Sequence, residues 1–325
     1  MARDYLTAAI FPGQGVQEYL PSMSKRLLEA DGDALETFEQ AGKFLGMNIL
    51  RLCTDGTPEE LDKPGNLQPA VATACVAAID ALRRRGFRPD VLAGHSLGEY
   101  PALYTAESIT LESMCRLVQA RAQYMEEANH KHPGAMSALL RIPIGQVRKI
   151  AKESGVEISA ENVLKSTQEN IVLSGSHAAL KRAREIVQAL TESQLVANAR
   201  ERAHVIDLNI PYPAHSKRMR LAATKMRKFI KPVPIYTPTT PVIANGTGRY
   251  ILTADEIRAD LPRQLTKPVL WDESMRFMES EGVVAIFEVG PGAVLTGMTK
   301  KIVSSNVEVI SFDPDLEEYD FIISA

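Results

Sequence analysis

The residues with the clearest chemical potential form a short motif around one serine. Gly94-His95-Ser96-Leu97-Gly98 matches the pattern G-x-S-x-G, and the compact apolar run at 90–94 predicts a strand directly before it. Glycines on either side permit a tight strand-to-helix turn that lifts the serine hydroxyl clear of the sheet. A helix predicted from Leu97 would direct free N–H groups at a developing oxyanion. We therefore interpret Ser96 as a nucleophile; the alternative is an incidental turn.

A serine nucleophile needs a general base, and the chain offers six histidines. His95 is too close along the chain to reach Ser96 in a suitable geometry, so we expect it to pack or to orient a neighbour. His215 follows the strand predicted at 205–210, in the kind of loop where open α/β sheets place functional residues. The others lie in the predicted solvated loop HKHP, near a helix start or in a charged run: His130, His132, His177 and His204. Position alone favours His215 without excluding the alternatives.

Two glycine-rich turns accompany the serine motif. FPGQG at 11–15 ends the first predicted strand, and it could supply a second backbone N–H beside the nucleophile. A phosphate-binding loop is the alternative, but neither G-x-G-x-x-G nor the Walker lysine is present. EVGPG at 288–292 follows a predicted buried strand, and we interpret it as structural rather than catalytic.

One arginine stands within a predicted helix of mixed polarity. Arg121 lies in the run QARAQYM at 119–125. A lone helical arginine is normally a solvated side chain. Arginine is nevertheless the side chain best shaped to hold a carboxylate with two hydrogen bonds, so a binding role stays open for Arg121.

The elements that must position these residues alternate along the chain. Strands predicted at 6–11, 90–94 and 283–289 alternate with helices predicted at 68–85 and 111–128, which indicates an α/β architecture with a mostly parallel sheet. Between them, a β-α-β-β-α pattern closed by a further strand predicts a small ferredoxin-like subdomain at 134–208. Residues 1–133 and 209–325 would then form one large α/β-hydrolase-like domain.

Composition excludes several classes of protein. The chain is 45% hydrophobic and 24% charged, with a formal net charge of −3, so no global basic field favours nucleic acid or an anionic membrane surface. No apolar run approaches the roughly 18 residues that a membrane span needs. The three cysteines have no metal-binding spacing, and their scarcity suits a reducing cytoplasm. No secretory signal is predicted, and we expect a cytoplasmic enzyme without a metal site.

The ordered motifs together resemble one family. FPGQG at 11–15, GHSLGEY at 94–100, ARAQYM at 120–125, PAHS at 213–216, RQLTKPVLW at 263–271 and EVGPG at 288–292 are similar to those of the malonyl-CoA:acyl carrier protein transacylases and the acyltransferase domains of polyketide synthases. The resemblance covers residues 11–299. It implies transfer of a malonyl group from malonyl-CoA to the phosphopantetheine thiol of an acyl carrier protein, through an acyl-serine, in fatty acid or polyketide biosynthesis and with no further cofactor.

The resemblance also implies a role for individual residues. Ser96 would be the nucleophile, and His215 its general base and later the acid for the leaving thiol. The backbone N–H groups of Gln14 and Leu97 would form the oxyanion hole. Arg121 would pair with the free carboxylate of malonate. Two supporting residues complete the set: Gln264, which matches a glutamine that helps to orient the histidine, and His95.

Departures from the family pattern concern the acyl group. Ala122 follows the arginine where glycine is usual, and Ala214 precedes the histidine where many malonyl-selective members have phenylalanine. Tyr212 and Ala214 loosely match some methylmalonyl-selective domains, and a small residue at 214 could leave room for a branched group. Three alternatives therefore stay open: a larger or branched donor such as methylmalonyl, an editing acyl hydrolase, and a catalytically inactive docking module for carrier proteins.

Overall fold

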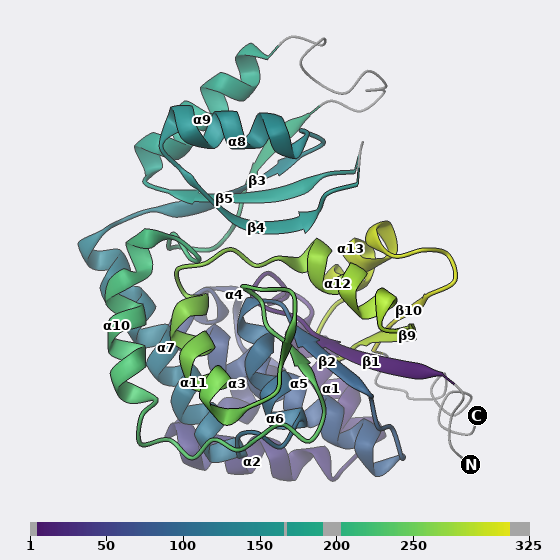
Figure 1. The fold of residues 1–325 in the computed structure, drawn as a ribbon. Coiled ribbons are helices and arrows are strands. Elements are labelled where there is room, and N and C mark those ends of the chain that lie inside the picture. The colour runs from purple at the N-terminus through teal and green to yellow at the C-terminus, as the bar shows by residue number, and fades with distance from the viewer. Residues whose placement is uncertain (1–4, 166–167, 191–202, 313–325) are drawn as a thin grey trace.

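The computed structural model describes residues 5–165, 168–190 and 203–312, which build two sheets with helices around them (Figure 1). The larger sheet has six strands, and all neighbours are parallel except the last pair, β7 and β8. In pairing order the strands are β10 (Glu308–Ser311), β9 (Val283–Glu288), β1 (Leu6–Phe11), β2 (Val91–Gly94), β7 (Val242–Ile243) and β8 (Tyr250–Ile251). The α/β class with a mostly parallel sheet is confirmed.

Helices enclose this sheet, as a parallel sheet with two buried faces requires. Residues 8–11 of β1 and all of β2 are buried. The surrounding helices are α1 (Leu20–Ala30), α2 (Ala34–Leu45), α3 (Ile49–Asp55), α4 (Pro58–Leu61), α5 (Pro64–Arg84), α6 (Glu99–Thr105), α7 (Leu111–Lys131), α10 (Arg220–Phe229), α11 (Ala254–Gln264), α12 (Trp271–Ser280) and α13 (Val294–Ile302), with short 3-10 turns at Ser96–Gly98 and Lys217–Met219.

The strand register brings the glycine-rich turns together. Phe11 pairs with Gly94 at the ends of β1 and β2, and Ile10 pairs with Glu288 at the end of β9. These three strands are parallel, so the turns that follow them lie at the same edge of the sheet. FPGQG, GHSLG and EVGPG, which are far apart in the sequence, are thus neighbours in space.

The turn EVGPG serves the fold in the way that its sequence suggests. Glu288 is buried, and its two carboxylate oxygens accept hydrogen bonds from the N–H groups of Leu295 (3.1 Å) and Thr296 (2.6 Å) in the first turn of α13. Free N–H groups at a helix start favour such a negative partner. The glutamate therefore fixes α13 to the end of β9.

The smaller sheet is antiparallel throughout. Its order is β4 (Glu157–Val163), β5 (Asn170–Gly175), β3 (Ala135–Leu140) and β6 (His204–Asp207), and α8 (Ile144–Ser154) and α9 (His177–Ala189) pack on one face of it around a second apolar core. Figure 1 shows this unit above the large sheet. Its other face carries Met136, Ala138, Ala160 and Val172, which pack with the main core.

The two units are joined along β4. Val269, just before α12, exchanges main-chain hydrogen bonds with Ser159 (3.0 Å) and Glu161 (2.9 Å), and the N–H of Leu164 donates to Asp272 (2.8 Å). Among the described residues, no helix combines the length and the apolar character that crossing a bilayer requires.

Several predicted boundaries are wrong. His130 lies in the last turn of α7 and His132 caps that helix, whereas the sequence predicted a loop there. The turn after Gly94 begins with a 3-10 segment, and the α-helix starts only at Glu99. The strand predicted to end at residue 210 ends at Asp207. The short strands β7, β8 and β10 were not predicted, because two to four residues give too little periodicity.

Candidate active site

Close backbone packing forces a sharp turn around Ser96. A Cβ on Gly94 would overlap the main chain of Gly98, and a Cβ on Gly98 would overlap the carbonyl group of Phe11. Ser96 itself has φ of 54°, in the left-handed region that residues other than glycine rarely adopt. Such strain persists only where the surroundings impose it. The serine hydroxyl lies within hydrogen-bond distance of His215.

His215 forms the hydrogen bond that a general base needs. Its Nε2 lies 2.6 Å from the Oγ of Ser96. On the other side of the ring, Nδ1 donates to the carbonyl oxygens of Gln264 (2.8 Å) and Lys267 (3.1 Å). These two acceptors fix the proton on Nδ1 and leave Nε2 free to accept the serine proton. Main-chain carbonyl groups thus occupy the place that an aspartate takes in a Ser-His-Asp triad.

The imidazole of His215 is held neutral. Burial lowers its pKa to about 3, and the charge of Arg121 and the neighbouring His95 act in the same direction. A neutral imidazole is the form that can take a proton. At neutral pH the side chain is therefore in the state that proton abstraction from Ser96 requires.

Arg121 is buried in α7 and reaches the reacting hydroxyl. One terminal nitrogen donates to Ser96 Oγ (2.9 Å), and the other donates to Oε1 of Gln68 (2.5 Å). The buried Nε of Arg121 has no hydrogen-bond partner among the described residues. The ordinary expectation for a lone helical arginine, a solvated side chain, is therefore wrong here. A buried guanidinium beside the hydroxyl of Ser96 could offer a fixed positive charge to an anionic group.

Tyr212 belongs to the same buried network. Its hydroxyl accepts a hydrogen bond from Nε2 of Gln68 (2.9 Å) and donates to the side-chain oxygen of Gln14. Gln68 therefore links Tyr212 to Arg121. Ala214 lies apart from this network and lines the open space in front of Ser96. No motif pointed to Gln68, although a glutamine within the apolar run of its helix was a usable signal.

The backbone groups expected to form an oxyanion hole lie in adjoining turns. Leu97 is in the first turn of the 3-10 segment, where N–H groups have no partner within the helix. Gln14 follows Gly13, whose Cβ position would lie only 2.6 Å from the carbonyl oxygen of His95. The structure thus brings the FPGQG turn directly against the serine motif.

His95 points away from the reacting hydroxyl. Its Nε2 lies 2.9 Å from the side-chain oxygen of Asn162 in β4, and its ring meets that of Trp271 edge to face at 5.5 Å. Burial lowers the pKa of His95. A side chain between the two units fits the packing role that was expected of it.

A second group of polar side chains holds the backbone of the serine motif from behind. The side chain of Asn245 accepts from the N–H of Ser96 (2.7 Å) and donates to the carbonyl oxygen of Gly94 (2.8 Å). Nε2 of Gln264 donates to the carbonyl oxygen of Ser96 (2.9 Å) and to Oε2 of Glu99 (2.8 Å). Gln264 therefore contacts His215 through its main chain and the main chain of Ser96 through its side chain. No sequence motif pointed to Asn245.

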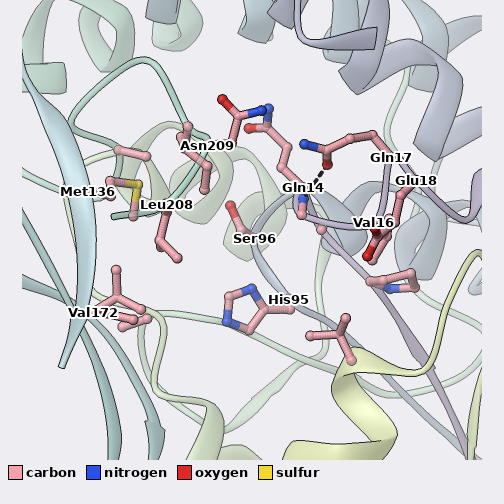
Figure 2. A pocket seen from close by; sticks show the side chains of 18 of the residues that line it. Gln14, Val16, Gln17, Glu18, His95, Ser96, Met136, Val172, Leu208 and Asn209 are labelled. Atoms are coloured by element: carbon pink, nitrogen blue, oxygen red, sulfur yellow. Dashed lines mark hydrogen bonds between the residues drawn. The ribbon is translucent and has the colours of Figure 1, made fainter. Parts of the chain in front are cut away.

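A cleft of about 810 Å³ opens in front of these groups, between the large sheet edge and the small sheet. Figure 2 shows Ser96 between its two walls, with Met136, Val172 and Leu208 on one side and Gln14 on the other. The volume falls in the range of cavities that hold small molecules and cofactors. A long flexible thioester can therefore reach the serine along a mostly apolar channel.

Comparison with known proteins agrees with this geometry. The model of the acyl transferase domain matches residues 9–318. The malonyl CoA-acyl carrier protein transacylase of Escherichia coli strain K12 is 34% identical over 92% of this chain and 93% of the relative, and that of Bacillus subtilis strain 168 is 32% identical over 96% and 95%.

Solved structures agree as well. The transacylase from Coxiella burnetii has a TM-score of 0.88 at 30% identity and covers 98% of this chain and 97% of its own. A malonyl-transacylase in complex with a type II polyketide synthase acyl-carrier protein has a TM-score of 0.86 at 32% identity, over 94% of this chain and 96% of its own. The resemblance seen in the motifs is thus confirmed, and the chain belongs to the acyl transferase domain family.

Proposed function

We propose that this protein transfers a malonyl group from malonyl-CoA to the phosphopantetheine thiol of an acyl carrier protein. The observation that carries the proposal is the placement of Arg121. Its buried guanidinium donates to the Oγ of Ser96, which also lies 2.6 Å from the Nε2 of His215. One cation thus adjoins the point where an acyl group would be attached, and malonate carries its free carboxylate only a short distance from its thioester carbon.

In the first half-reaction, His215 accepts the proton of Ser96 as Oγ attacks the thioester carbonyl carbon. The N–H groups of Gln14 and Leu97 stabilise the oxyanion. Collapse of the tetrahedral intermediate breaks the bond from carbon to sulfur, and the imidazolium returns its proton to the leaving coenzyme A thiol. Arg121 releases the serine and pairs with the malonyl carboxylate.

In the second half-reaction the same groups act in reverse order. The carrier thiol gives its proton to His215 and attacks the ester on Ser96. The serine then leaves with that proton, and the product is the malonyl thioester of the carrier. Main-chain carbonyl partners on Nδ1 keep the imidazole in one tautomer through both steps.

We also propose a finer description of the two structural units. A ferredoxin-like subdomain at 134–208 is supported by the strand order β4-β5-β3-β6. Helix α8 follows β3 along the chain, and helix α9 follows β5. An α/β-hydrolase-like large domain, residues 1–133 and 209–325, is supported by the serine on a strand-to-helix turn. We also propose that no cofactor besides the substrate thioester is needed, because the chemistry above needs nothing more. A cytoplasmic location is proposed because free cysteines suit a reducing compartment.

Intact mass spectrometry after incubation with isotope-labelled malonyl-CoA tests the function directly. We expect one malonyl adduct on the enzyme and its transfer to a phosphopantetheinylated carrier. Ser96→Ala should abolish the adduct, since the covalent intermediate is lost. Rapid release of free malonate would instead indicate an editing hydrolase, and no adduct with any donor would indicate a docking module. An adduct retained in Ser96→Ala would refute the nucleophile assignment.

A branched donor is the second candidate, and one observation favours it. Ala214 lines the cleft beside His215, so a small side chain occupies a position next to the reacting acyl group. Competition between malonyl-CoA and methylmalonyl-CoA measures the preference. Under this candidate, Ala214→Phe should suppress the methylmalonyl adduct far more than the malonyl adduct. Equal effects on both donors would remove the candidate.

A further inference from the structure

Behind the serine motif, two buried carboxyl groups meet in a place that the mechanism above does not use. Glu99 is the first residue of α6 and is fully buried; Asp260 lies in α11 and is 6% exposed. Each has one buried oxygen, Oε1 of Glu99 and Oδ2 of Asp260, without a conventional hydrogen-bond donor among the described residues. Two acceptors left without donors in the protein interior would be costly.

A single proton between these oxygens accounts for both. Burial and the adjacent negative charge of Asp260 raise the pKa of Glu99 well above its usual range, and a hydrogen bond between the two side chains raises it further. Burial raises the pKa of Asp260 as well, but the hydrogen bond from Glu99 and the charge of Arg263 both act against that rise. Two carboxylates in contact cannot both ionise cheaply, so one keeps its proton.

The surroundings decide which group is the acid. Oδ1 of Asp260 lies 3.8 Å from a guanidinium nitrogen of Arg263, which favours the ionised form of Asp260. The phenol of Tyr100 is a further titratable group that interacts with both carboxyl groups. Glu99 has no ion-pair partner among the described residues. The proton therefore stays on Glu99 and is donated to Asp260.

The second oxygen of Glu99 connects the pair to the active site. Oε2 accepts hydrogen bonds from Nε2 of Gln264 (2.8 Å) and from the side-chain amide of Asn245. Those two amides are the groups that bind the main chain of Ser96 on both sides. The main-chain carbonyl of Gln264 is also the acceptor for Nδ1 of His215.

We propose that Glu99 and Asp260 share one proton, and that Glu99, kept neutral in this way, positions the turn of Ser96 and the carbonyl partner of His215. Glu99 contacts neither the substrate nor the reacting atoms, so it is a positioning residue. The proposal rests on the acyl-transfer function proposed above. It adds that Glu99, which lies five positions after the end of β2 in the GHSLGEY motif, acts as an acid rather than as an anion.

The decisive variant is Glu99→Gln, because glutamine copies a protonated carboxyl group. Its oxygen can accept from Gln264 and Asn245, and its NH₂ group can donate to Asp260. We expect the rate constant of malonyl-enzyme formation to stay within about threefold of the original protein. Glu99→Ala removes both contacts, so Ser96 and His215 would be held less well in line. We expect that rate constant to fall about 10- to 100-fold, while KM for malonyl-CoA changes little.

An infrared measurement tests the proton without relying on activity. The unmodified protein at neutral pH should show the carbonyl stretching band of a protonated carboxylic acid, shifted in D₂O and absent from Glu99→Gln. Glu288→Gln is the matched control: burial raises the pKa of Glu288, but its two carboxylate oxygens accept N–H bonds from α13, which favour the ionised form. The band that Glu99→Gln removes should therefore remain in Glu288→Gln. The infrared measurement does not use Glu99→Ala, so it tests the shared proton even if that variant fails to fold.

Three results would overturn the proposal. They are a Glu99→Gln variant as slow as Glu99→Ala, a Glu99→Ala variant as fast as the unmodified protein, and the lack of a band that Glu99→Gln removes. Failure of the proposed function is recognised separately, since the unmodified protein would then form no malonyl adduct whatever the infrared band shows.

Discussion

The two walls of the active-site cleft differ in what they contribute. The edge of the large sheet supplies the polar groups, Ser96, His215 and Arg121, each held by buried hydrogen bonds. The small sheet faces them with apolar side chains such as Met136 and Val172. The wall from the large sheet can thus act on the acyl group, and the wall from the small sheet can select the shape of the substrate that binds. We expect substitutions on the first wall to change rate and donor selectivity, and those on the second to change binding.

The largest effect should come from Arg121→Ala. Removing the partner of a desolvated charge costs about 2–5 kcal/mol, which is roughly 30-fold to several thousand-fold in malonyl transfer. Acetyl-CoA has no second carboxylate and should lose little. Arg121→Lys should restore only part, since a point charge cannot form two parallel hydrogen bonds.

The measurement is the specificity constant for malonyl-CoA and acetyl-CoA with each variant. Arg116→Ala is the control, because Arg116 lies on the exposed side of the same helix. If malonyl and acetyl transfer fall together, Arg121 serves structure rather than donor choice.

The pH dependence of acylation should depend on the same arginine. Burial and Arg121 both disfavour the imidazolium form, so His215 has a pKa of about 3 rather than about 6.5. The specificity constant for acyl-enzyme formation should therefore stay flat from pH 8 to about pH 5 and fall only in stronger acid. Arg121→Ala removes one of the lowering causes, so its acid limb should move to higher pH.

Acetyl-CoA is the donor for this comparison, because it does not depend on the arginine for binding. Burst kinetics over a pH series locate the limb in both proteins. An acid limb near pH 6.5 in the unmodified protein would contradict the low pKa of His215.

A change on the apolar wall should act on binding alone. Ala138→Leu adds bulk to the small sheet where it faces the cleft. We expect KM for malonyl-CoA to rise about tenfold, in line with about 1–2 kcal/mol for an overfilled site, with kcat nearly unchanged. Ala178→Leu, at an exposed position of α9, is the control. A fall in kcat without a change in KM would show that the small sheet also aligns the reacting groups.

The smallest effect concerns the carrier protein. Lys217 is exposed and Arg218 is half-buried, just beyond His215. If this basic edge attracts an acidic carrier, Lys217→Glu with Arg218→Glu should raise KM for the carrier at least about twofold, from ~0.2–1 kcal/mol for each of two surface pairs, and less at high salt. Self-acylation by malonyl-CoA should be unchanged. An equal change in both half-reactions would point to a general disturbance of His215.

Local sequence determined the nucleophile motif more fully than the rest of the site. Gly94 and Gly98 are required because other main-chain atoms approach them closely, and this need is visible as a five-residue pattern. The α/β class could be predicted because long apolar segments carry a clear periodicity. A strand as short as β7 has no detectable periodicity, and it forms because it pairs with β2.

Only the tertiary structure decided which polar side chains are buried and what they contact. Asn245 and Glu99 lie 146 residues apart and meet because β2 and β7 are neighbours in the sheet. The same packing buries Arg121, which its helix alone would have left in solvent. Spacing along a chain reveals contacts within one turn or strand. Hydrogen bonds between distant segments depend on the strand order, and that order is fixed by burial of the whole sheet.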